Sequence, residues 1–491
     1  MNNNVTTFKK RVSMKIQKHL LTVLVFMSMH THLLRADCND CYAHTIFIPR
    51  QMAYNPIYED ALIFDQYVHM DERFLLSIKP VYTQIVGDSL KKYFNINHMC
   101  SMNVQENGSG DIDPLWFQVI SAPGTFYSST LSFNPVQKTT GAMLYCAWIL
   151  PRDFALTINT AFIKRKNNMH ICETNIAADD LGQVPGFATL TQAFANPDIK
   201  YGKICGSRSK GGVDDIQIKA IKNFKLCDDE SLFGDIYALI GIPTGKGSKA
   251  KYLFEPIVGS KHVQFGLGVN AEKSFDIRLC DQFSLYGEFK WRHAFGAKEI
   301  RSFDMMPNGQ WSRYMLFTTP TADDDPFPAI NNLTFTTNVK PRNSFDILIA
   351  THAERRQFSF ELGYNFWYRQ AEKVCPCINL PPVGIADLVG IAQLANQMPV
   401  TVTTSSNATI SEGVFPNEFQ MPRDATYTLV TACNINTCSG TQATSSTNAV
   451  FGSLGYRHQC FDLGINVSYE NAANSNTASI VSAWANFGVH F

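Results

Sequence analysis

The sequence predicts an all-β fold, a transmembrane antiparallel β-barrel of about twelve strands within a range of ten to fourteen. Three observations predict it. Apolar and polar residues alternate with a period of two in segments of about ten residues, as in a strand with one apolar face. Short and long connections alternate between these segments. Beyond the N-terminal region, no stretch reaches 18 consecutive apolar residues, so no transmembrane helix is expected.

The composition restricts the class of protein. The 491 residues include 42 Lys plus Arg and 42 Asp plus Glu, so the formal net charge is zero. Without an excess of basic residues, nucleic acid is not expected as a partner. The mean hydropathy of −0.10 argues against a helical membrane protein.

The N-terminal region has the pattern of an export signal. The apolar stretch "LLTVLVFMSM" (20–29) follows several basic residues, and "LLRA" offers a cleavage site after Ala36. We therefore expect a cleaved signal peptide at 1–36. Residues 37–71 are expected to form an N-terminal periplasmic lead-in or plug, and residues 72–491 the barrel.

The period-two pattern sets the expected strands. In "FDLGINVSY", Phe461, Leu463, Ile465, Val467 and Tyr469 alternate with polar residues and glycine. The same pattern predicts strands at 72–84, 138–149, 153–165, 213–224, 232–243, 262–274, 282–293, 342–352, 357–369, 447–457, 461–470 and 478–491. Phe461 to Tyr469 is eight steps, or about 26 Å along the strand and roughly 20 Å along the membrane normal after tilt, which nearly matches the ~25 Å apolar band of a membrane barrel.

The connections distinguish the two ends of the barrel. Long outer loops are expected at about 85–137, 166–212, 294–341 and 371–446, with tight turns at the other end. Membrane barrels have short periplasmic turns and long extracellular loops, whereas a β-sandwich gives no reason for this alternation. With an even number of strands, the start of the first strand and the end of the last strand both lie on the periplasmic side. Within the last loop, the run ending at Pro399 has helical spacing and is expected to constrict the barrel, to cover its mouth or to pack on its neighbours.

The C-terminal strand resembles the assembly signal of Gram-negative outer-membrane proteins. It ends on an aromatic residue with apolar residues at alternating positions before it, namely Ala483, Ala485, Phe487, Val489 and Phe491. "GVDDIQIKAIKNF" (212–224) also resembles strands of porin-like and fatty-acid-transporter-like barrels. The resemblance implies insertion by the barrel-assembly machinery into the outer membrane of a Gram-negative bacterium, with its lipid as the surrounding partner.

Polar residues on the opposite strand faces are candidates for lining the lumen. They are Glu288, Lys290, Arg292, Glu361, Asn365, Arg369, Asp462 and Asn466. Charges of both signs inside a barrel form either a salt-bridged plug or a wetted pore wall. Gly363, Gly464 and Gly488 lie beside them and favour a wetted or partly filled lumen.

All 13 cysteines follow the expected cleavage site, so an exported chain would be expected to pair some of them. The disulfide candidates are Cys38, Cys41, Cys375, Cys377, Cys433 and Cys438. Cys227, Cys280 and Cys460 fall at short turns, where they are positioned to link to other envelope proteins.

No arrangement of residues in the sequence indicates catalysis. The loop "GIPTGKGSK" (241–249) is one residue too short for a phosphate-binding loop, and no Ser-His-Asp set has local support. We expect no enzyme activity, no cofactor and no metal site. The sequence favours a porin or channel that passes small solutes. The alternative is a surface-exposed adhesin or a cysteine-linked structural envelope protein, because the loops exceed what a pore needs.

Overall fold

The structure is a computed structural model of the chain. It describes residues 43–61, 74–106, 110–119, 127–177, 186–225, 232–277, 280–319, 326–376, 378–385, 408–412, 429–458 and 460–490. The predicted signal peptide and the apolar run ending at Pro399 lie outside these residues. Within these ranges, no helix combines the length and the hydrophobicity that crossing a bilayer requires.

Twelve of the described strands form a closed antiparallel ring, which confirms the predicted fold. Each strand pairs with the next one along the chain, and the first strand closes the ring by pairing with the last. The ring strands are β1 (Phe74–Val86), β4 (Val136–Leu150), β5 (Phe154–Asn168), β8 (Ile216–Lys225), β9 (Leu232–Ile242), β10 (Gln264–Phe275), β11 (Gln282–Ala294), β17 (Arg342–Arg355), β18 (Phe358–Arg369), β22 (Ser445–His458), β23 (Phe461–Ala472) and β24 (Ser479–His490).

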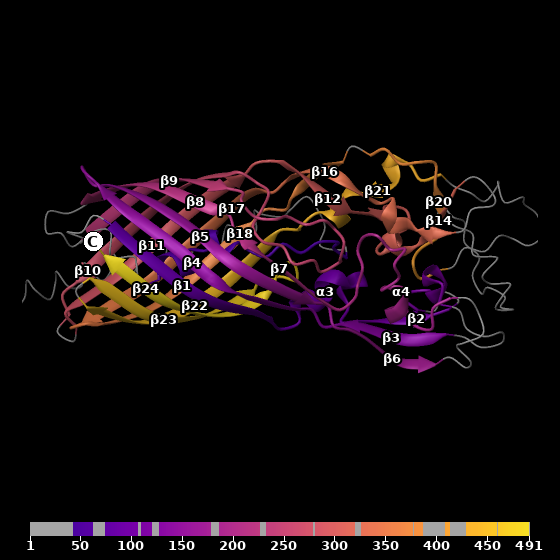
Figure 1. Ribbon diagram of the computed structural model, residues 1–491, viewed down its shortest axis with the longest axis horizontal. Coiled ribbons are helices and arrows are strands. Elements are labelled where there is room, and N and C mark those ends of the chain that lie inside the picture. The colour runs from indigo at the N-terminus through magenta and orange to yellow at the C-terminus, as the bar shows by residue number, and fades with distance from the viewer. Residues whose placement is uncertain are drawn as a thin grey trace, which may run out of the picture. The chain divides into compact units, whose positions relative to one another are not determined.

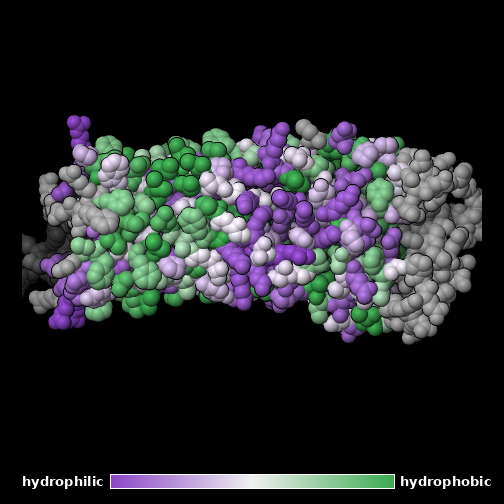
Figure 2. Space-filling view, in the orientation of Figure 1, coloured by the Kyte–Doolittle hydropathy of each residue, from purple (hydrophilic) through white to green (hydrophobic). Residues whose placement is uncertain are grey.

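The alternation of side chains along these strands gives the ring an apolar outer face. In β23, Leu463, Ile465 and Val467 are exposed, whereas Asp462 and Asn466 on the opposite face are buried. In Figure 2, hydrophobic side chains gather over the ring strands. Hydrophilic side chains become more frequent toward the end of the ring from which the long connections leave. This is the arrangement that a barrel presents to the hydrocarbon core of a membrane.

Long connections leave the ring at one end only. They cover residues 87–135, 169–215, 243–263, 295–341 and 370–444, and we call their described residues the cap. Tight turns join the strands at the other end, where β24 also ends (Figure 1). A thirteenth strand, β7 (Ser207–Val213), pairs with the cap end of β5 and is separated from β8 by Asp214 and Asp215. The predicted strand at 213–224 is therefore interrupted by two buried carboxylates.

The cap is built from short strands and single helical turns. Its strands are β2 (Ser101–Gln105), β3 (Ser128–Phe133), β6 (Ile171–Ala177), β12 (Ala297–Ser302), β13 (Asp304–Met305), β14 (Leu316–Thr318), β15 (Phe327–Pro328), β16 (Thr334–Lys340), β19 (Lys373–Pro376), β20 (Gly384–Ile385) and β21 (Ile435–Asn436). Its helices are α3 (Ser89–Phe94), η3 (Ile96–His98), η4 (Pro114–Phe117), α4 (Leu190–Ala193), η5 (Ser312–Tyr314), η6 (Ala329–Asn331), η8 (Ala432–Asn434) and η9 (Thr437–Gly440).

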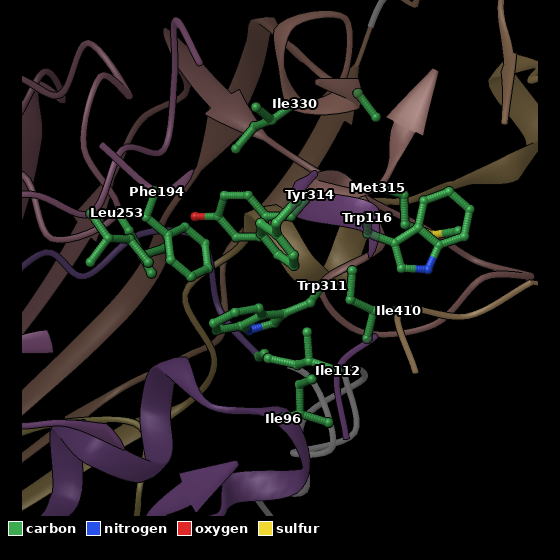
Figure 3. Close-up of a cluster of buried hydrophobic side chains, with 14 of the residues drawn as sticks. Ile96, Ile112, Trp116, Phe194, Leu253, Trp311, Tyr314, Met315, Ile330 and Ile410 are labelled. Carbon is green, nitrogen blue, oxygen red and sulfur yellow. The ribbon is translucent and has the colours of Figure 1, made fainter. Parts of the chain in front are cut away.

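The cap has a hydrophobic core of its own, to which several connections contribute (Figure 3). Trp311 packs against Phe133 and Phe194 with ring centroids 5.8 Å apart in both cases, and its indole N–H donates to the carbonyl of Phe94 over 2.9 Å. Trp116 donates to the carbonyls of Thr409 and Glu412 over 3.2 and 3.1 Å. Because these residues come from different connections, the long loops fold together as one unit rather than as separate flaps.

Candidate functional site in the barrel interior

Residues 43–61, which we call the inner segment, extend from the cap into the barrel. Near the start of the segment, Phe47 packs against Tyr93 and Phe254 of the cap. Further along, η1 (Met52–Tyr54) and α2 (Pro56–Asp60) are buried among the ring strands. Asn55 starts α2, because its side chain accepts the N–H of Ile57 and Pro56 occupies the first helical turn. This short turn aims the Glu59 side chain at the barrel wall.

Glu59 is the centre of a buried ion-pair cluster. Its carboxylate lies 2.7 Å from the Nζ atom of Lys219 on β8 and 3.2 Å from that of Lys290 on β11. Gln217 donates to both carboxylate oxygens over 3.0 and 3.1 Å. On the wall, Glu288 lies 3.3 Å from Lys290 and 3.7 Å from Lys219. Two lysines therefore share two glutamates, one on the wall and one on the inner segment.

A second cluster joins the inner segment to β11, β17 and β18. Asp346 accepts a hydrogen bond from Arg50 and a second from Arg292, the latter over 2.7 Å. Arg50 also donates to Asn365 over 3.1 Å, and Arg292 donates to the carbonyl of Tyr54 over 2.8 Å. One carboxylate thus neutralises two buried guanidinium groups, one of which belongs to the inner segment.

Further hydrogen bonds attach the inner segment to the rest of the wall. The side chain of Lys79 donates to the backbone carbonyls of Tyr58 and Glu59. The side chain of Asn159 donates to the backbone carbonyl of Ala53. The N–H of Met52 donates to Asp214 over 2.9 Å, and the hydroxyl of Tyr54 donates to Asp215 over 3.1 Å. The ring of Tyr58 meets Trp484 edge-on at 4.9 Å. Among the described residues, side chains of β1, β5, β8, β11, β17, β18 and β24 contact the inner segment through these groups.

The predicted lumen residues all lie on inward strand faces, but they fall into different groups. Glu288, Lys290, Arg292 and Asn365 belong to the two clusters around the inner segment. Arg369 lies near the cap end and donates to Ser445 over 3.2 Å.

The remaining three are held by the wall itself. Glu361 accepts from the hydroxyl of Tyr286, and Asn466 donates to the carbonyl of Trp484 over 3.2 Å. Asp462 lies near the tight turns, where it contacts His490 and Arg457. The structure therefore does not bring Asp462 to the inner segment.

Gly363 leaves no open space in the lumen, so the prediction is wrong at this position. A Cβ atom at this position would lie 2.4 Å from the ring of Phe451 and 2.6 Å from the Cβ atom of Ala350. The aromatic ring fills the volume that the missing side chain leaves. At Gly488 the nearest atom, in Asp462, would be 3.4 Å away, which is an ordinary contact.

The other predicted residues are placed as follows. Ala483, Phe487 and Val489 are exposed on the outer face of β24 and Ala485 is partly exposed, whereas Phe491 lies outside the described residues. Cys375, Cys433, Cys280 and Cys460 form no disulfide within the described part of the chain, and the backbone N–H of Cys438 donates to Asn436. Cys38, Cys41, Cys227 and Cys377 lie outside the described residues. No group of described His, Cys, Asp or Glu side chains could hold a metal ion.

Most of the partners of the candidate lumen residues in the interior were not predicted from the sequence. Lys219 and Asp346 carry a detectable signal, because each is a charged residue on the inward side of a strand whose neighbours are apolar. Arg50, Tyr54 and Glu59 carry none. They lie on an irregular segment, so no periodicity relates them to the strands that they contact.

Comparisons with known proteins add little sequence information. No known family profile and no curated protein matches the chain. Solved structures that resemble it include an outer-membrane channel from Pseudomonas putida F1, at 8% identity over 86% of this chain and 97% of that chain, with a TM-score of 0.38. The CymD monoaromatic hydrocarbon channel is 8% identical over 91% of this chain and 95% of that chain, with a TM-score of 0.30. The toluene transporter TodX of P. putida is 8% identical over 89% of this chain and 93% of that chain, with a TM-score of 0.29. The description of the fold rests on the strand pairing of this chain.

Proposed function

We propose that the protein is an outer-membrane channel for small solutes and that the inner segment is its plug. Export by a cleaved signal peptide and insertion through the C-terminal strand, with its alternating apolar residues and final Phe491, are part of this proposal. The channel makes and breaks no covalent bonds. Its function is to pass solutes when the inner segment moves and to hold the lumen closed when it does not.

The observation that supports this function best is the chemistry of the contacts between plug and wall. The inner segment packs against the ring strands through an apolar cluster that includes Met52, Ile57 and Tyr58. It is also held by ion pairs and hydrogen bonds from Lys79, Lys219, Lys290 and Arg292. Water and solute ions can replace such contacts, whereas a packed apolar core excludes both. The wall also keeps a counter-ion of its own, since Glu288 lies near both lysines that bind Glu59.

The test compares two isosteric substitutions within one cluster. Glu59→Gln removes the charge on the plug, but Lys219 and Lys290 still lie near Glu288. Breaking a buried ion pair costs about 3–5 kcal/mol, so the open probability should rise by about tenfold or more. Single-channel recording of the refolded full-length protein in a planar bilayer measures it.

Glu288→Gln is the matched control, because it removes the same charge from the same cluster on the wall. The two lysines then keep Glu59 as their partner, and the plug stays attached. Equal open probabilities for wild type, Glu59→Gln and Glu288→Gln would contradict the plug. Opening in both variants would show that the cluster stabilises the wall rather than the plug.

The core of the cap favours a second candidate function, a surface-exposed binding protein. A pore needs only loops that cover its mouth, yet Trp116, Phe194, Trp311 and Tyr314 give this cap a shared interior. A folded unit of this kind presents a fixed outer surface to a partner. A bilayer that stays silent with Glu59→Gln, together with binding of the purified protein to host cells, would favour this alternative. Cysteine links to other envelope proteins belong to the same proposal, and comparing reduced with non-reduced gels of whole envelopes tests them.

A further inference from the structure

A cavity lies where the inner segment meets the cap end of the barrel. Its volume is about 80 Å³, which holds several waters or one small anion, since a single water needs ~10–15 Å³ by the same measure. Arg50 and Tyr54 of the inner segment line it, together with Arg292, Trp367 and Arg369 of the ring strands. The cavity is therefore formed by plug and wall together.

Positive charge exceeds negative charge around this cavity. The cationic side chains that line it are Arg50, Lys261, Arg292, Arg342 and Arg369, and the carboxylates that line it are Glu299 and Glu372. Just outside it, Asp215 accepts from Tyr54 and Ser260, while the other neighbouring carboxylates have cationic partners. Asp346 binds Arg50 and Arg292, and Arg301 lies 3.1 Å from Glu299 and 3.3 Å from Glu372.

Arg369 differs from Arg50 and Arg292, which both bind Asp346. Its guanidinium donates to Gln442 and to Ser445, which are both neutral. Within the described part of the chain, no carboxylate lies within salt-bridge distance of it. Its Cζ atom and that of Arg50 lie 5.7 and 5.2 Å from the ring centroid of Trp367. Two guanidinium groups thus contact one aromatic side chain.

Several donors at the cavity have no acceptor. The Nε–H groups of Arg50, Arg292 and Arg369 and the indole N–H of Trp367 have no hydrogen-bond partner among the described residues. All four side chains line the cavity, and those of Arg292 and Trp367 are only 3% and 5% exposed. Leaving a buried donor unsatisfied is costly, so donors gathered at one cavity indicate an acceptor ligand.

We propose that this cavity is a binding site for a small oxyanion, a carboxylate or phosphate group. The guanidinium forks match the geometry of such a group, and the indole N–H adds a further donor. The site goes beyond the proposed function, because it binds its ligand whether or not the barrel conducts. Since Arg50 contributes to it, a bound anion also joins the inner segment to the wall.

Isothermal titration of the full-length protein in detergent micelles at low ionic strength tests the site. The ligands used are sodium acetate, inorganic phosphate and, as a neutral isostere of acetate, acetamide. We expect one or both anions to bind and acetamide not to bind, and the preferred anion identifies the ligand class. Arg369→Gln should weaken binding by about tenfold or more, because no described carboxylate pairs with its charge, and Trp367→Phe by about three- to tenfold, because it removes one neutral donor.

Arg355→Gln is the matched control. Arg355 is an exposed arginine at the tight-turn end of β17, so its loss changes the net charge equally without touching the cavity. Affinity unchanged in both cavity variants, or equally weakened in Arg355→Gln, would overturn the site. Thermal unfolding of each variant shows whether it is folded, and Trp367→Phe keeps the test decisive should Arg369→Gln not fold. This titration measures binding and not conductance, so its outcome does not depend on whether the barrel is a channel.

Discussion

A single missing side chain shows how closely the interior is filled. Gly363 on β18 sits opposite Phe451 and Ala350 in the strand register, and the Phe451 ring occupies the space that any Cβ atom at residue 363 would need. Strand alternation predicts that this glycine points inward. It does not predict which neighbouring side chain leans over it, because that depends on the rotamer of a residue on another strand.

Gly363→Ala should therefore destabilise the barrel. The added methyl group has to displace an aromatic ring in a packed environment, which costs about 1–3 kcal/mol. Urea unfolding of the protein in lipid vesicles measures the change. Gly452→Ala is the control, because its nearest atom, the carbonyl oxygen of Glu361, would be 3.8 Å from the new Cβ atom. Equal losses in both variants would contradict the packing at Gly363.

The charged residues of the site were predictable only in part, for the same reason. Glu288, Lys290 and Arg292 alternate with apolar residues on one strand, so their inward direction follows from the period of two. Lys290 binds Glu59 and Arg292 binds the carbonyl of Tyr54, and both partners lie more than 200 residues away in the sequence, on a segment without periodicity. Pattern analysis gives the face of a side chain, whereas ion pairing depends on which distant segment fills the barrel.

At the scale of the elements, the strands were the most predictable part. All twelve predicted ring strands are present, and their ends differ from the prediction by only a few residues. The reason is physical, since a strand between lipid and a polar interior must alternate along its whole length. The cap strands were not predicted, because they are short and pack against one another, so no single periodicity describes them.

One pair of residues links β12 of the cap to the chain just before β10. The two ring nitrogens of His262 lie 2.7 Å from the carbonyl oxygen of Phe295 and 2.6 Å from the carboxylate of Glu299. Both neighbours are acceptors, so the ring donates at both positions when it is protonated. Burial alone would lower the pKa of His262, but the hydrogen bond and the charge of Glu299 outweigh it and raise the pKa above 6.5, with smaller contributions from the carbonyl of Phe295 and from Glu372.

The stability of the cap should therefore fall at alkaline pH. A raised pKa in the folded state means that the stabilisation is complete below about pH 6.5 and is lost as the pH rises through the folded value. We expect the unfolding temperature to fall between pH 5 and pH 9, and this fall to be smaller in His262→Gln. Thermal scans of both proteins across that range measure it, and parallel curves for the two would contradict a role for His262.

At the scale of the whole molecule, one outer face carries the apolar side chains of twelve strands. Ile465 is 64% exposed on the ring, and Met306 is 63% exposed on the cap. Both side chains are apolar and almost equally accessible, yet in the proposed placement only one of them faces lipid. They therefore provide a paired test of which part of the chain lies in the membrane.

Ile465→Arg should prevent stable insertion, because an arginine near the middle of the bilayer costs about 2–4 kcal/mol on a barrel surface. Met306→Arg should insert as wild type does, since water surrounds that side chain. Refolding yields into phospholipid vesicles measure both. A water-soluble barrel would tolerate the two substitutions equally, and that result would refute the membrane placement.

The position of the inner segment restricts the order of assembly. The ring closes along one seam, where β1 pairs with β24, and residues 43–61 are enclosed by the strands on both sides of it. A chain that closed this seam first would have to thread a folded turn and its charged side chains through a filled lumen. Zipping of the first and last strands must therefore be a late step, taken once the N-terminal residues are already inside.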